Sequence, residues 1–126
     1  EFPSSPLADR FTTDFETIVS DPEVRIVVEC MGGLNPAYTF VKRCLEAGKS
    51  VVTSNKELIA SKGQELLEIA RANNLNLLFE ASVGGGIPII RPIVQCLAAN
   101  EISEVVGILN GTTNFILTKM IKEGMM

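Results

Sequence analysis

Apolar residues recur along the chain in two alternating patterns. Short apolar runs bounded by polar, glycine or proline residues are typical of strands, and they predict strands at 25–29, 50–53, 77–81 and 102–109. The stretches between these runs carry apolar residues three and four positions apart, which predicts helices at 13–21, 36–47, 61–72, 88–97 and 113–123. The first strand run is continuously apolar, as expected of a strand covered on both faces in a parallel sheet. The last run is longer and more alternating.

Residues that favour helix ends mark several of these boundaries. Thr13 with Glu16, and Ser61 with Gln64, have the spacing of a capping box, in which two side chains satisfy free amides at a helix start. Asn35 is a good N-cap, and the proline after it suits the first helical position. Helix and strand therefore alternate without interruption. This alternation predicts an α/β fold of right-handed β-α-β units around a mainly parallel sheet, the architecture of dinucleotide-binding domains.

The motif that opens most dinucleotide-binding domains is absent. Such a domain begins with a strand and a G-x-G-x-x-G turn whose amides hold the pyrophosphate, and this sequence contains no such turn. We therefore expect the chain to be an internal piece of a longer protein, holding the C-terminal part of a Rossmann-like domain.

Composition narrows the classes of function. The net charge of −4 and the scattered basic residues argue against a nucleic-acid or anionic-membrane partner. No apolar run reaches the roughly 20 residues needed to cross a bilayer, and 1–7 does not resemble a signal peptide, so a cytoplasmic location is the default expectation. The three cysteines, odd in number and irregularly spaced, are expected to be reduced.

The sequence contains no histidine, which limits the chemistry available within it. Ser-His-Asp and Cys-His nucleophile systems are excluded, together with the commonest transition-metal ligand. Glu29 and Glu80 are the only carboxylates embedded in apolar strand runs, where burial would raise the pKa of an unpaired acid. An acid/base pair is not favoured, because the two lie on different predicted strands and no partner for either is detectable.

Four motifs, taken in order, carry a resemblance to a known family. They are VVECMGG at 27–33, VVTSNK at 51–56, FEASVGGGIP at 79–88 and GILNGTTN at 107–114. Together they resemble homoserine dehydrogenase. The resemblance implies an enzyme that interconverts L-aspartate 4-semialdehyde and L-homoserine with NADP or NAD, and that forms a homodimer. It also implies a partial Rossmann-like NAD(P)-binding domain at 1–81, followed at 82–126 by the start of the α/β catalytic and dimerisation domain.

The same resemblance implies what the chain lacks. The Gly-rich turn of the family would precede residue 1, and its acidic substrate-binding residues and proton-donating lysine would follow residue 126. We therefore expect the chain by itself to be catalytically inactive, and the activity to belong to the full protein.

Two loops are predicted to contact the cofactor. Small residues at the carboxyl edge of a parallel sheet allow a dinucleotide to approach the backbone. By the resemblance, the cofactor-binding residues are Cys30, Met31, Gly32, Ser54, Asn55 and Lys56. Lys56 is further expected to lie beside the nicotinamide and substrate and to position or polarise the reacting carbonyl. The alternatives are a plain strand-to-helix turn and a solvated surface lysine.

The remaining site residues follow from the last two motifs. In the family, carbonyl oxygens of the glycine loop hold a monovalent cation, usually sodium, and the matching positions are Glu80, Val83, Gly85 and Ile87. The alternatives are an anion site at the next helix start, or a tight turn that only joins two domains. Contacts to the substrate are implied for Asn110, Gly111 and Thr112, although Asn and Thr at such a junction often serve only as helix caps.

Two other functions remain open. An aspartate-semialdehyde dehydrogenase would share the Rossmann pattern, but it needs a nucleophilic cysteine with a histidine partner, and the sequence has no histidine. A non-catalytic nucleotide-binding or scaffolding module would use the glycine loops only as turns. Turnover by the full protein distinguishes this last alternative.

Overall fold

The centre of the structure is a three-stranded parallel sheet. The structure, a computed structural model, describes residues 6–108 and 110–124. Strands β1 (Ile26–Glu29), β2 (Ser50–Thr53) and β3 (Leu77–Leu78) follow one another across the sheet in chain order. In the parallel register, Glu29 lies opposite Thr53, and Val51 lies opposite Leu77. The predicted α/β fold with a parallel sheet is confirmed.

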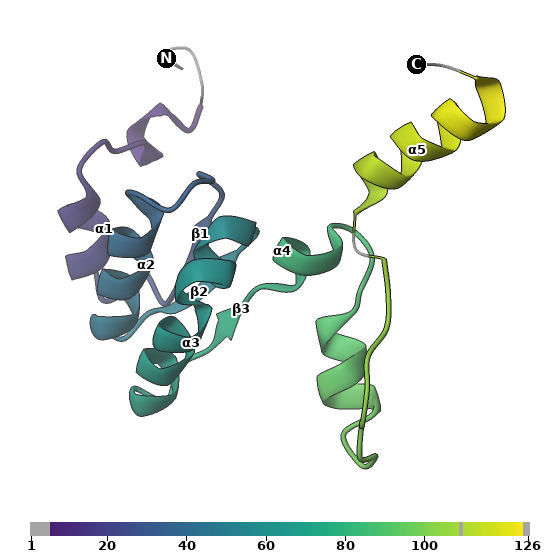
Figure 1. Ribbon diagram of the computed structural model, residues 1–126. Helices are drawn as coiled ribbons and strands as arrows, with labels where there is room; N and C mark the ends of the chain where they lie inside the picture. The colour runs from purple at the N-terminus through teal and green to yellow at the C-terminus, as the bar shows by residue number, and fades with distance from the viewer. Residues whose placement is uncertain (1–5, 109, 125–126) are drawn as a thin grey trace.

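Helices connect and flank these strands (Figure 1). They are η1 (Ala8–Arg10), α1 (Phe15–Ser20), α2 (Ala37–Glu46), α3 (Lys56–Ala72), α4 (Glu80–Gly84), the π-helical η2 (Pro92–Cys96) and α5 (Gly111–Glu123). Among the described residues, no helix combines the length and the apolar character that crossing a membrane requires.

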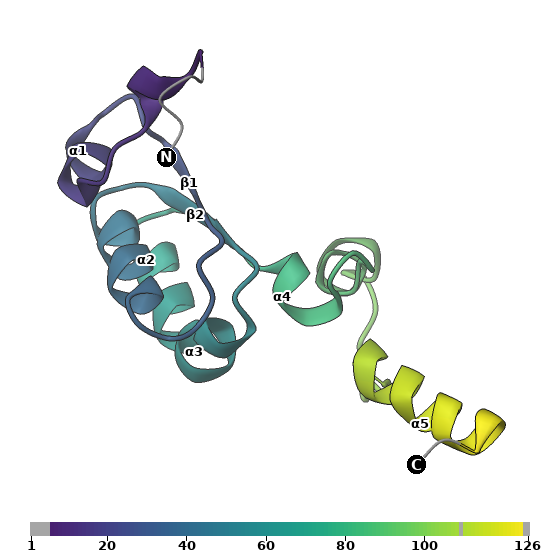
Figure 2. The same ribbon diagram turned by 90° about the horizontal axis from the view of Figure 1, so that it is seen from above.

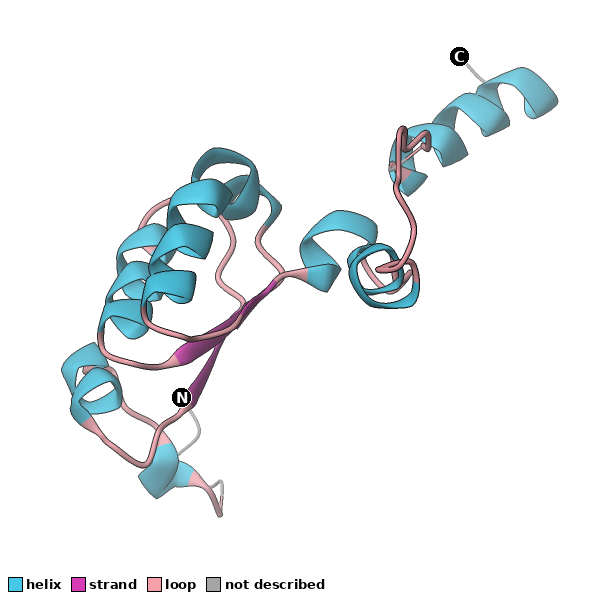
Figure 3. Ribbon diagram, turned by 90° about the horizontal axis from the view of Figure 1, so that it is seen from below, coloured by secondary structure: helices cyan, strands magenta, loops and turns pink. Residues whose placement is uncertain are grey.

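The hydrophobic core lies between the sheet and two helices. Helices α2 and α3 cover the same face of the sheet (Figure 3). The buried apolar side chains are Ala37, Val41, Cys44, Leu45, Val51, Leu58, Leu66, Ala70 and Leu77. On the opposite face, Ile26 and Val28 are 64% and 65% exposed. The prediction that the first strand is covered on both faces is therefore wrong for the described residues, because both long helices pack on one side.

The segment before β1 packs against α2 and is hydrogen-bonded to a buried lysine. The rings of Phe15 and Phe40 lie 4.3 Å apart between centroids, and Arg43 forms an ion pair with Glu16. Lys49 is only 3% exposed, and its ammonium group donates hydrogen bonds to the carbonyl oxygens of Asp21 at 2.6 Å and Val24 at 2.7 Å. These contacts fix the path of the chain into the first strand.

The C-terminal part of the structure differs from the predicted pattern. Residues 101–108 form no strand, and Leu109 lies outside the described residues, so the strand predicted at 102–109 is not observed. A strand needs a hydrogen-bonded neighbour, and the described residues offer none to this segment. Helix α5 forms close to the predicted bounds, and it lies apart from the sheet in both views (Figures 1 and 2).

Two further element boundaries need correction. Helix α3 begins at Lys56 rather than at Ser61, because Asn55 caps it by accepting a hydrogen bond from the Leu58 amide at 3.1 Å. The third strand ends at Leu78 instead of continuing to Ala81. Helices α1, α2 and α5 start within two residues of the predicted positions, which is the usual uncertainty of a helix end. In place of the helix predicted at 88–97, the π-helical η2 spans Pro92–Cys96.

A polar cluster joins the outer surfaces of α2 and α3. The Glu65 carboxylate accepts hydrogen bonds from the Tyr38 hydroxyl at 2.5 Å and from the Lys42 ammonium group at 3.1 Å. Lys62 lies 3.4 Å from the other carboxylate oxygen. The hydrogen bond from Tyr38, followed by that from Lys42, lowers the pKa of Glu65 from 4.5 to about 2.

This cluster makes part of the stability dependent on pH. Because the pKa of Glu65 is lower in the folded protein, its contribution is present above about pH 4.5 and is lost as the pH falls toward about 2. We expect Tyr38→Phe to lower the melting temperature at pH 7, and the difference from the unmodified protein to shrink between pH 4.5 and 2.

The measurement is a series of thermal unfolding curves from pH 7 to pH 2, with Ser61→Ala as a control that removes an exposed hydroxyl from α3. A difference between Tyr38→Phe and the unmodified protein that stays constant over this range would contradict the assignment of the effect to Glu65.

Candidate active site

The candidate site lies where β1 and β2 end. Both strands run in the same direction, so the loops that follow them, 30–33 and 54–55, emerge at the same edge of the sheet. The carboxyl edge is where open α/β sheets bind their ligands. The structure therefore brings together the two loops predicted to contact the cofactor.

The loop after β1 owes its shape to two glycines. Gly32 and Gly33 both have positive φ, at +77° and +73°, a region that other residues rarely adopt. A Cβ atom at either position would meet nothing within 4 Å. Glycine is thus required here by the backbone conformation, and the space beside both residues is open. Cys30, Met31 and Gly32 are exposed at this edge.

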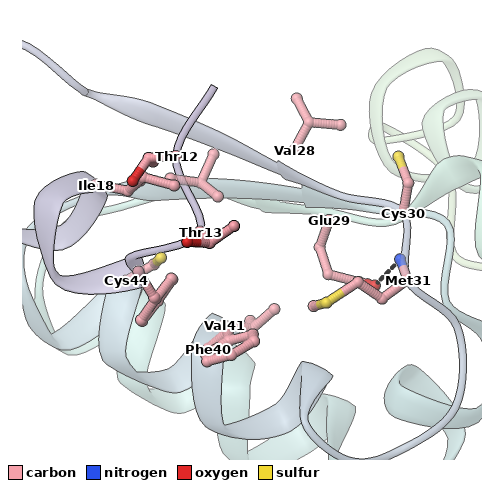
Figure 4. A pocket seen from close by; sticks show the side chains of 12 residues that line it. Thr12, Thr13, Ile18, Val28, Glu29, Cys30, Met31, Phe40, Val41 and Cys44 are labelled. Carbon is pink, nitrogen blue, oxygen red and sulfur yellow. Dashed lines mark hydrogen bonds between the residues drawn. The ribbon is translucent and has the colours of Figure 1, made fainter. Parts of the chain in front are cut away.

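Glu29 points from the end of β1 into the protein. Glu29 is 4% exposed, and its carboxylate accepts hydrogen bonds from the backbone amides of Met31 at 2.6 Å and Gly32 at 3.4 Å. The Thr53 hydroxyl donates to its second oxygen. Figure 4 shows Glu29 on the α2 side of β1, with Val28 and Cys30 on the other side. The expectation that this acid lacks a partner is wrong.

The hydrogen bonds continue from Thr53 into α3. The Thr53 hydroxyl oxygen accepts a hydrogen bond from the Asn55 amide at 3.0 Å. The side chain of Asn55 donates to the Gly33 carbonyl oxygen at 2.6 Å and caps α3 through Leu58. Asn55 is 5% exposed. Of the residues predicted in this second loop, Asn55 is therefore turned inward, whereas Ser54 and Lys56 face solvent.

Lys56 occupies the first position of α3, directly after the capping residue. Its side chain is exposed, so its ammonium group is accessible at the carboxyl edge of the sheet. A lysine in this position can bind a carboxylate or polarise a carbonyl group.

A mostly apolar cavity of about 280 Å³ borders the same edge. Thr12 and Thr13 line it from the segment before α1, Phe40 from α2, and Glu29 and Met31 from β1 and the loop after it (Figure 4). Glu29 therefore both lines this cavity and accepts the hydrogen bond from the Thr53 hydroxyl.

The glycine loop follows α4. Glu80 is the first residue of α4, and Val83 is half-buried within it, while Gly85 and Ile87 are exposed in the turn that follows. Gly85 has a φ of +62°. The Ile87 amide donates to the Gly84 carbonyl oxygen at 3.1 Å, which closes this turn. Within the described residues, no three acidic, cysteine or histidine side chains gather into a metal site.

The Glu80 side chain caps the next helical segment. Its carboxylate accepts hydrogen bonds from the amides of Ile89, Ile90 at 2.9 Å and Arg91 at 2.7 Å. These bonds, the one from Ile89 above all, lower the pKa of Glu80. The Glu80 side chain thus connects the start of α4 to the segment that follows the glycine loop. Because the carboxylate is used in these bonds, the predicted cation would be bound by the backbone carbonyl of Glu80.

The predicted substrate residues begin α5. Asn110 caps this helix, because its side chain accepts a hydrogen bond from the Thr113 amide at 2.8 Å. Gly111 and Thr112 are exposed in the first turn. The capping interpretation of Asn110 is confirmed. The structure does not bring these residues to the two cofactor loops, since α5 lies apart from the sheet (Figure 2).

Sequence reasoning missed Thr53 and Gly33 as parts of the site. Thr53 bonds to both Glu29 and the Asn55 amide, and Gly33 accepts from the Asn55 side chain. A signal for Thr53 was present, since Glu29 and Thr53 both end their strands and a parallel register without offset pairs them.

Comparisons with known proteins identify the family. The family model described as the NAD-binding domain of homoserine dehydrogenase matches residues 5–80. A second family model, described as homoserine dehydrogenase, matches residues 88–126. The chain is 52% identical over 113 residues to a homoserine dehydrogenase of Synechocystis sp. and 47% identical over 112 residues to one of Bacillus subtilis. These alignments cover 90% and 89% of the chain but 26% of each relative, so the chain spans about a quarter of their length.

Solved structures agree with this result. A homoserine dehydrogenase from Thiobacillus denitrificans matches with a TM-score of 0.85 and 47% identity, over 90% of this chain and 26% of that one. A homoserine dehydrogenase from S. aureus matches with a TM-score of 0.71 and 38% identity, over 99% of this chain and 29% of that one. The first family model alone accounts for more than half of the sequence. The chain belongs to the homoserine dehydrogenase family.

Proposed function

We propose that the full-length protein interconverts L-aspartate 4-semialdehyde and L-homoserine with NADP or NAD. The observation that carries this proposal is the position of Lys56, which is exposed at the first turn of α3 directly after Asn55, the residue whose side chain is bonded to the loop that follows β1. Family membership supports the choice of reaction, since the relatives are named homoserine dehydrogenases. The chain contributes part of the site, and the proposal concerns the whole protein.

The cofactor loops fit a dinucleotide. The space beside Gly32 and Gly33 is open, and no side chain there prevents a ligand from approaching the backbone. Cys30, Met31 and Ser54 are exposed beside them and would contact the cofactor. When bound, the nicotinamide supplies or accepts the hydride. The Lys56 ammonium group would hold the substrate or stabilise negative charge on the carbonyl oxygen.

The second part of the chain is proposed to serve the substrate and the subunit contact. We place the boundary between the NAD(P)-binding domain and the catalytic domain at residues 81 and 82. Gly111 and Thr112 would contact the amino-acid end of the substrate, next to the cap at Asn110. The full protein is proposed to be a cytoplasmic homodimer that acts on small molecules and binds neither nucleic acid nor membrane. The net charge of −4 supports this last point.

The glycine loop is proposed to hold a monovalent cation, with sodium as the first choice. The ligands would be the carbonyl oxygens of Glu80, Val83, Gly85 and Ile87, because hard cations prefer oxygen. The role would be architectural, fixing the turn between α4 and the next helical segment.

The Lys56 proposal predicts a large loss of activity on substitution. We expect Lys56→Ala to lower kcat/KM for homoserine about 10²- to 10³-fold in the full-length protein, because a charged group at the reacting carbonyl is removed. Lys62→Ala, which removes a lysine farther along α3, serves as the control. Reduction of NADP, and separately of NAD, is followed by absorbance.

Three outcomes of this experiment can be distinguished. A strongly impaired Lys56→Ala beside a normal Lys62→Ala supports the proposal. An active parent in which the two variants behave alike would remove Lys56 from the site. A parent that is inactive with both nucleotides would favour the non-catalytic binding module.

The cation proposal predicts specific stabilisation by sodium. A cation that binds only the folded protein adds about 1.4 kcal/mol at ten times its dissociation constant. We expect the melting temperature to rise with sodium chloride but not with choline chloride at equal ionic strength. Gly85→Ala should abolish the difference, because alanine is strained at the φ of +62° and distorts the turn. An equal rise of the melting temperature in both salts would contradict the cation site, because it would be an effect of ionic strength alone.

A further inference from the structure

We propose that Glu29 is a positioning residue, whose buried carboxylate joins the loop at 30–33 to the first turn of α3 and thereby orients Lys56. This inference rests on the proposed function, because it assigns Glu29 a part in the reaction of that site. It depends on the hydrogen bonds at the ends of β1 and β2 and on the direction of each.

The directions of these bonds match a side chain that acts only as an acceptor. Glu29 accepts from three donors, the amides of Met31 and Gly32 and the hydroxyl of Thr53, and it donates to none. The Thr53 oxygen in turn accepts from the Asn55 amide, so the Thr53 proton is free to point toward Glu29. Every donor in this chain of bonds has an acceptor. A buried charge is tolerated only when it is hydrogen-bonded in this way.

The bonds close into a ring that contains both cofactor loops. From Glu29, one path leads through Met31 and Gly32 along the loop to Gly33. The other path leads through Thr53 to Asn55, whose side chain donates to the Gly33 carbonyl oxygen at 2.6 Å. Residues from two strands and one helix start are thus held to one another. A displacement of the loop would therefore move the helix start as well.

Lys56 is the next residue after this ring. Its backbone follows Asn55, which also caps α3 through the Leu58 amide. The position of the ammonium group depends on the orientation of this first turn. Misplacement of a reacting group by about 1 Å can cost about 10²-fold in rate. Loss of the Glu29 charge should therefore act on turnover through Lys56, without any contact between Glu29 and the substrate.

Substitutions of nearly equal size test the direction of the bonds. In Glu29→Gln, one acceptor oxygen becomes an NH₂ donor. If the NH₂ group faces the loop, the bonds from the two loop amides are lost. If it faces Thr53, the hydroxyl must turn its proton away and accept instead, so the present arrangement of the ring is lost in either case. Thr53→Val removes the hydroxyl and leaves the shape. Glu23→Gln, at an exposed acid before β1, is the matched control. Glu29→Asp keeps the charge and should restore part of the activity.

The experiment is a double-mutant cycle in the full-length protein. We measure kcat and KM for homoserine, together with melting temperatures, for Glu29→Gln, Lys56→Ala and the double variant. We expect Glu29→Gln to lower kcat by about 10²-fold, Thr53→Val to act in the same direction, and Glu23→Gln to have no effect. In the Lys56→Ala background, the loss caused by Glu29→Gln should nearly vanish, because the group through which it acts is gone.

A purely structural role gives a different result. Partial unfolding would reduce activity by the same factor in both backgrounds, so additive losses in the cycle would overturn the inference. Activity of Glu29→Gln equal to that of Glu23→Gln would overturn it too.

These outcomes presuppose an active parent, and an inactive parent would instead overturn the proposed function. Hydrogen exchange then tests the ring without turnover. Exchange at the Met31, Gly32 and Leu58 amides should speed up together in Glu29→Gln if the ring couples them, and unchanged exchange at Leu58 would refute the coupling.

Discussion

The pairing of Glu29 with Thr53 is the contact on which the geometry of the site depends. The two residues end adjacent parallel strands in the same register, so their side chains meet on the covered face of the sheet. Burying a carboxylate is costly unless its oxygens are hydrogen-bonded, and here three donors supply those bonds. The loop after β1 is bonded directly to this carboxylate, and the start of α3 is connected to it through Thr53 and Asn55.

The same constraint explains which residues face the ligand side. The amides of Met31 and Gly32 are bonded to Glu29, so the loop cannot offer them to a cofactor phosphate. Asn55 is occupied in the same way by Gly33 and Leu58. What remains accessible at this edge are exposed side chains such as Lys56 and the open space beside the glycines. The buried polar side chains thus hold the two loops in place, and the exposed side chains are accessible to a ligand.

The parts of the fold that sequence predicts well are those set by local pattern. Three apolar runs become the strands of the sheet, and the apolar stripe at 36–47 becomes α2. The predicted start of α3 is wrong because both Ser61 and Asn55 can cap a helix. The helix starts after Asn55, and the earlier start lets Leu58 extend the apolar stripe into the core. The run at 102–109 alternates like a strand. Alternation alone cannot make one, because a strand needs a partner and none of the described residues pairs with it.

The candidate site shows the same limit at the level of single side chains. Lys56 was predicted from a motif, and its exposure at the sheet edge follows from its place directly after a strand and a cap. The partners of Glu29 could not be read in this way, because Thr53 is 24 residues distant and only the register of two strands brings it within reach. A buried acid in an apolar strand therefore requires hydrogen-bond donors, and a neighbouring strand of the sheet can supply them. The neighbouring strand that ends in threonine is the place where this sequence provides one.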